Sequence, residues 1–92
     1  MTLEELFQSY IYKKKLAGLS EATVWDYKHH LKGFFAFVGG SLPVSALTLE
    51  QVEAYVRSLL ATKRLSRATV ATYVRNVRIF LNYADRQGLL SF

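Results

Sequence analysis

Residues 19–37 read LSEATVWDYKHHLKGFFAF, and residues 65–83 read LSRATVATYVRNVRIFLNY. The two stretches are 46 residues apart (65 − 19 = 46) and share the frame Leu-Ser-x-Ala-Thr-Val. Each begins with Ser-x-x-Thr, a pattern that starts a helix because the serine oxygen can accept a hydrogen bond from the backbone three residues later. The chain therefore contains a duplicated helix start, and these two helices decide the fold.

The apolar residues of the duplicated helices recur with the 3.6-residue helical period, so each set lines one face. Two similar amphipathic helices in one bundle would explain these stripes, but would not explain the matching starts as well. The predicted core positions are Val24, Tyr27, Leu31, Phe34, Phe35 and Val38 in the first copy, and Val70, Tyr73, Val77, Phe80, Leu81 and Ala84 in the second.

Helix signals also occur outside the duplication. Thr2 with Glu5 and Thr48 with Gln51 have the spacing of a capping box. Gly18 suits the left-handed conformation that ends a helix. The sequence predicts an all-α, single domain, with a third helix whose buried stripe is Leu49, Val52, Val56, Leu59 and Leu60. We expect helices at about residues 3–17, 21–38, 49–62 and 67–87.

The composition excludes several classes of site and structure. The chain has 92 residues and no cysteine, so neither a disulfide nor a cysteine-based zinc site can form. No apolar run approaches the roughly 20 residues that a membrane span needs, so no membrane partner is expected. His29 and His30 lack carboxylate or cysteine partners at ligand spacing, so no metal or small-molecule cofactor is indicated.

The charge is unevenly distributed along the chain. The net charge is +5, while residues 1–62 contain six basic and six acidic side chains. The whole excess therefore lies in residues 63–92, an asymmetry that suggests a polyanionic partner. Against Asp85 alone, this segment carries Lys63, Arg64, Arg67, Arg75, Arg78 and Arg86.

Arg67 stands where the first copy has Glu21. A helix N-terminus carries a partial positive charge and unpaired N–H groups, so acidic residues are favoured there. An arginine at this place fits an anion such as phosphate, held with the Ser66 and Thr69 hydroxyls. Alternatively, Arg67 pairs with a nearby carboxylate or is simply solvated.

One flank of each duplicated helix is polar. Such side chains can donate to phosphate or read base edges in a major groove. An ordinary solvated face would show the same pattern. The matching positions are Thr23, Asp26 and His30 in the first copy and Thr69, Thr72 and Asn76 in the second, with Arg75 beside them.

Taken in order, these motifs resemble the core-binding domain of the tyrosine recombinases, the phage-integrase family. The resemblance rests on YKKKLAGLS, SEATVWDYKHHLKGF, TLEQV and SRATVATYVRNVRIFLNYADRQGLL, and covers nearly the whole chain. It implies a four-helix, SAM-like orthogonal bundle that forms half of a clamp around duplex DNA at the crossover site. It also implies a prokaryotic or phage-borne, cytoplasmic protein.

In that family, the second and fourth helices approach the DNA. The resemblance implies DNA contacts by Ser20, Thr23, Asp26 and His30 on the second helix and by Ser66, Arg67, Thr69, Thr72, Arg75 and Asn76 on the fourth. It also implies contacts with the DNA phosphate backbone by Lys13, Lys14, Lys15, Lys63 and Arg64. Catalysis belongs to a separate C-terminal domain, which is expected to be absent from this chain. The chain itself is then not an enzyme, and its partners are duplex DNA, that catalytic domain and other recombinase protomers.

Trp25 and Ile79 lie off the apolar stripes of their helices. Trp25 fits packing against the first helix or a lone surface position, whereas Ile79 suggests a partner surface. These residues also leave open a second function, in which the chain is a helical protein-interaction module with a basic face.

Overall fold

A computed structural model describes residues 1–62 and 64–92 of the chain. In these residues the chain forms α1 (Leu3–Leu16), α2 (Glu21–Val38), a short 3-10 turn η1 (Val44–Ala46), α3 (Leu49–Ala61) and α4 (Arg67–Arg86). The expected all-α fold is confirmed. The molecule measures 37 × 31 × 19 Å, and its thin dimension is about two helix diameters. None of the helices in this part of the chain has the length and apolar character needed to span a membrane.

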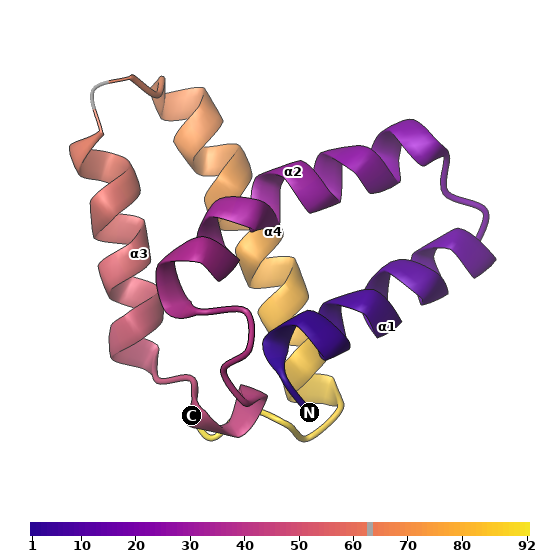
Figure 1. The fold of residues 1–92 in the computed structure, drawn as a ribbon. Coiled ribbons are helices and arrows are strands. Elements are labelled where there is room, and N and C mark those ends of the chain that lie inside the picture. The colour runs from indigo at the N-terminus through magenta and orange to yellow at the C-terminus, as the bar shows by residue number, and fades with distance from the viewer. Residues whose placement is uncertain (63) are drawn as a thin grey trace.

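The long helices α2 and α4 cross near the centre of the molecule, and α1 and α3 lie on either side (Figure 1). The pair α2 and α4 makes the most extensive contact between elements. The duplicated stripes meet there: Phe34 and Phe80, at equivalent positions, are both fully buried. Eight of the twelve predicted core positions are buried, and the other four, Tyr27, Phe35, Val38 and Tyr73, are partly buried against them.

An aromatic cluster fills the space between α1 and the crossing. The Phe80 ring meets the rings of Phe7, Tyr10 and Phe35 edge-on, with centroids 5.7, 5.8 and 5.7 Å apart. Edge-to-face aromatic pairs stabilise a core beyond the area they bury. One phenylalanine thus joins α1, α2 and α4.

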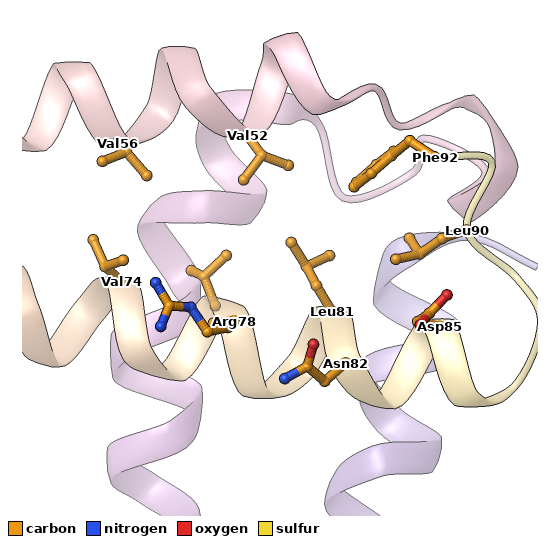
Figure 2. Close-up of a pocket in the computed structure, with 10 residues that line it drawn as sticks. Val52, Val56, Val74, Arg78, Leu81, Asn82, Asp85, Leu90 and Phe92 are labelled. Carbon is orange, nitrogen blue, oxygen red and sulfur yellow. The ribbon is translucent and has the colours of Figure 1, made fainter.

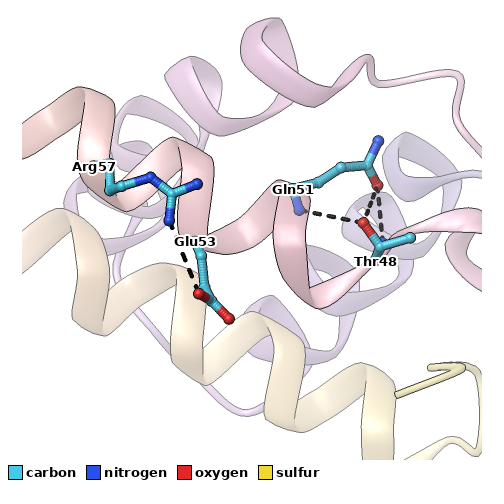
Figure 3. Close-up of polar contacts among 4 residues, drawn as sticks. All are labelled: Thr48, Gln51, Glu53 and Arg57. Carbon is cyan, nitrogen blue, oxygen red and sulfur yellow. Dashed lines mark hydrogen bonds and ion pairs between the residues drawn. The ribbon is translucent and has the colours of Figure 1, made fainter.

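The helices begin where their capping residues stand. Thr2 and Glu5 form a reciprocal capping box on α1, and Thr48 and Gln51 form one on α3 (Figure 3). Gly18 follows α1 with a φ of +89°, a left-handed conformation that glycine adopts without strain. Sequence-based boundaries at residues 17, 62 and 87 each fall one residue beyond the observed helix ends.

The N-terminus of α1 is closed by the loop that precedes α3. The N–H of Leu3 donates to the Leu42 carbonyl at 2.9 Å, and the N–H of Glu4 donates to Gly40 at 3.0 Å. A Cβ at position 40 would meet the flexible Glu4 side chain, which packs over Gly40. The first backbone N–H groups of α1 therefore donate to acceptors within the protein and are not available to an external partner.

The predicted stripe of α3 is wrong in two places. Leu49 and Leu60 are 51% and 68% exposed, whereas Tyr55 is buried. Tyr55 packs edge-on against Phe34 of α2, with centroids 5.3 Å apart. Because α2 packs against the side of α3 that carries Tyr55, the opposite edge of the predicted apolar stripe is left uncovered. Leu49 and Leu60 lie at that edge and stay exposed.

Replacing Phe80 by alanine should lower the free energy of unfolding by about 3–5 kcal/mol, because it removes a buried ring from three helices at once. Urea unfolding followed by circular dichroism measures this loss. Phe92→Ala is the control, because Phe92 is 46% exposed and should change stability much less. Equal losses for both variants would contradict the assigned core.

Candidate nucleic-acid interface

The starts of α2 and α4 have the same geometry. Ser20 Oγ accepts from the Thr23 N–H at 3.2 Å, and Ser66 Oγ accepts from the Thr69 N–H at 3.1 Å. In each pair the two hydroxyl oxygens are also 3.0 Å apart. The repeated Ser-x-x-Thr frame thus encodes two equivalent helix caps.

Each cap leaves hydrogen-bond donors for an external partner. Only one hydroxyl of each Ser–Thr pair donates within the pair, so the other keeps its hydrogen. The first two backbone N–H groups of a helix also have no intrahelical acceptor. Among the described residues no acceptor serves these groups at Glu21, Ala22, Arg67 or Ala68, in contrast to the closed start of α1.

Three arginines follow one side of α4. Arg67, Arg75 and Arg78 line a surface groove with Leu60 and Leu65. Arg78 was not among the sequence-based contacts, although its spacing of 11 residues from Arg67 places both on one helical face. Within the described part of the chain, the ion pair that forms is Arg57 with Glu53 on α3, at 3.9 Å (Figure 3). The three α4 arginines are thus available to an anionic partner.

The crossing of α2 and α4 contains a polar contact. Asn76 Nδ2 donates to His30 Nδ1 at 2.6 Å, and Asn76 is only 5% exposed. Because 30 + 46 = 76, these residues occupy equivalent positions in the two copies. The Asn76 amide is thus buried and engaged here, and base reading by Asn76, expected from the sequence, would require it to leave this contact.

The environment of His30 favours its neutral form. Partial burial lowers the pKa of His30 below 6.5; the charges of His29 and Arg75 act in the same direction, and Asp26 opposes them. A neutral imidazole can accept at Nδ1, which is what the amide of Asn76 requires. The crossing therefore holds His30 unprotonated near neutral pH.

The two capped ends diverge from this crossing. Figure 1 shows the start of α2 at the upper right and the start of α4 at the upper left. Each cap is ten residues from the contact (30 − 20 and 76 − 66), or about 15 Å along its helix. Both ends are exposed, but they cannot hold the same phosphate.

The lysines at the end of α1 differ in how they are held. Lys13 Nζ lies 5.2 Å from the centre of the Tyr83 ring, and Lys14 Nζ lies 5.3 Å from that of Tyr10. Lys15 is exposed without such a contact. The loop after α1 leads directly to Ser20, so these charges accompany the start of α2.

A cavity of about 350 Å³ lies between α3 and α4. Figure 2 shows Val52 and Val56 of α3 facing Val74 and Leu81 of α4, with Phe92 at one end. Arg78, Asn82 and Asp85 add polar groups to this largely apolar lining, which contains no histidine, serine or second carboxylate beside Asp85. In the residues that the structure describes, no cluster of three or more potential metal ligands forms either.

The phage integrase N-terminal SAM-like domain family matches residues 6–89. The chain belongs to this family. No curated protein and no solved structure gives a significant match. In integrases this SAM-like domain is a non-catalytic part. The resemblance read from the ordered motifs is confirmed.

The other expected contacts of this SAM-like domain are placed as follows. Asp26 and Arg64 are exposed, and Lys63 lies outside the described residues. Thr72 is half-buried and donates to the Ala68 carbonyl at 3.0 Å, so its hydroxyl is already used. Ile79 is also half-buried and packs against the core, so it does not provide the partner surface expected of it.

The His30 contact predicts a pH dependence of stability. Because the folded pKa is lowered, the unfolded chain takes up the proton first as the pH falls below 6.5, and stability then decreases. Wild type should lose more unfolding free energy between about pH 8 and pH 5 than His30→Gln, whose side chain stays neutral. Urea unfolding at both pH values tests this, and identical losses would contradict the assigned contact.

Proposed function

We propose that this chain is a non-catalytic DNA-binding module of a site-specific tyrosine recombinase, contacting duplex DNA through the N-terminal halves of α2 and α4. Family membership supports a role in an integrase. The paired, exposed helix starts are the observation that carries the DNA contact. Catalysis then belongs to a separate domain of the parent protein.

The two helix starts would play unequal parts. The α4 start combines free N–H groups and a spare hydroxyl with Arg67, and exposed Arg64 precedes it. The α2 start offers the same cap, but Glu21 in its first turn repels a phosphate. We therefore assign the tighter backbone contact to α4, with Lys15 supporting α2.

The divergence of the ends fits separate contacts on one duplex. Two arms of about 15 Å each can span more than a major groove, which is about 12 Å wide. In this arrangement the starts of α2 and α4 bind DNA phosphates on either side of the major groove. The side chains near the α2–α4 crossing then face the major groove. Exposed Asp26 and half-buried His30 occupy that inner position on α2.

Such binding depends mainly on phosphate neutralisation. With about four to five contacts, the logarithm of the binding constant should fall with the logarithm of salt concentration at a slope of about −4. A single module also lacks the avidity that a complete clamp would have, so its affinity should be modest.

Arg67→Glu tests the role of the α4 start. The change copies the first repeat into the second and should weaken duplex binding about 10-fold at low salt, with a salt slope closer to zero by about 1. The reason is the loss of a phosphate contact at a helix end that otherwise attracts anions. Fluorescence anisotropy of a labelled duplex measures both quantities.

Arg57→Glu is the matched control for net charge, because Arg57 lies on α3 and pairs with Glu53. It should weaken binding much less than Arg67→Glu. Arg67→Glu should leave the thermal unfolding temperature unchanged or slightly raised, since an acid suits a helix start. Equal affinity of wild type and Arg67→Glu would contradict the proposed contact.

One observation favours a second function. The groove lined by Arg67, Arg75 and Arg78 also has apolar walls from Leu60 and Val74, which suits an acidic, amphipathic protein segment more than a phosphate backbone. A protein-interaction module of this kind would show no advantage of duplex DNA over heparin. It would also depend on exposed Leu60, which the DNA account does not use.

A further inference from the structure

Trp25 is the single tryptophan of the chain, and the fold leaves it 62% exposed on α2. Its indole stacks on the imidazole of His29, with ring centroids 5.0 Å apart and planes only 6° from parallel. His29 is also exposed. Two flat rings thus lie together on the surface, one turn of helix apart, outside the core that the duplication builds.

Basic side chains flank this stack. Trp25 lines a hollow of about 190 Å³ together with Lys15 of α1 and Lys28 of α2, and Glu21 is the acidic member of the same hollow. Within the described residues neither lysine forms an ion pair. The hollow therefore combines an aromatic surface with two available cations.

Further ring contacts, edge-on and tilted rather than stacked, lead from His29 toward the α2–α4 crossing. The His29 ring lies 6.0 Å from that of His30, and His30 lies 5.2 Å from Tyr73 of α4. Four aromatic rings consequently run from the surface at Trp25 to the second duplicated helix. The position of the exposed stack is fixed by residues that hold α2 against α4.

An exposed aromatic face beside cations matches the chemistry of an unpaired nucleobase and its phosphates. Bases stack on aromatic side chains regardless of sequence, while lysines neutralise the backbone. We infer that Trp25 and His29 form a stacking platform for an unpaired base of single-stranded DNA. The inference rests on the proposed function in that it takes DNA as the partner, but it adds a second site and a second form of DNA.

A simpler account is that the pair only supports the helix, because side chains four residues apart can stabilise one another. That account predicts no change at the indole when DNA is added. Because no other tryptophan is present, fluorescence reports on this site alone.

The test titrates the 92-residue chain with a single-stranded oligonucleotide of about ten nucleotides, within the usual range of single-strand sites. The matched control is a strand of the same length with abasic sugars, which keeps the phosphates and removes the bases. We expect strong quenching of Trp25 by the first strand and little by the second. Equal quenching by both strands, or none by either, would overturn the inference.

Trp25→Leu keeps an apolar side chain and removes the aromatic face. Its affinity for the labelled single strand should fall about 10-fold, which corresponds to the loss of one stacked base. Duplex binding should change less than twofold, and circular dichroism should show an intact helical fold. Unchanged single-strand affinity in Trp25→Leu would overturn the platform even if duplex binding is normal.

The two proposals therefore fail separately. Normal single-strand quenching with no duplex binding would remove the duplex interface and keep the platform. Normal duplex binding without base-dependent quenching would remove the platform and keep the duplex interface. His29→Phe, which retains a ring under the indole, should keep most of the single-strand affinity, whereas a loss equal to that of Trp25→Leu would contradict the role of stacking.

Discussion

The packing of α2 against α4 is the constraint on which the rest of the structure depends. The same residue frame builds both helices, so their apolar faces are alike. Two equivalent residues, His30 and Asn76, contact each other where the helices cross. The aromatic cluster around Phe80 then attaches α1 to this pair. The crossing also determines where the capped ends point, and hence what a partner can reach.

Local signals allowed much of the fold to be predicted from the sequence. A cap acts within four residues and an apolar stripe within one helix, so Ser20, Ser66 and the core positions could be read directly. Asn76 could not, because its environment depends on which face of α4 meets α2. The position of Leu60 depends likewise on how far the neighbouring helices extend around α3. The exposure of the candidate contact residues was predicted where it follows from a helix start, and missed where it depends on how the helices pack.

The two copies share their architecture and differ in charge. Glu21 offsets the partial positive charge of its own helix start, whereas Arg67 adds positive charge at the start of α4. The first copy instead exposes Trp25 and His29, where the second has Ala71 and Arg75. The two copies thus present chemically distinct surfaces on either side of one helix crossing.

The central claim is that DNA meets the two exposed helix starts on either side of the crossing. Amide chemical shifts recorded while unlabelled duplex DNA is added test it most directly, because every backbone position reports at once. The account predicts the largest shifts at residues 20–30 and 64–76, with no shifts at the start of α1, whose amides are already hydrogen-bonded, or in the body of α3. Shifts confined to Leu60 and α4, with none at residues 20–30, or no shifts at all, would contradict it.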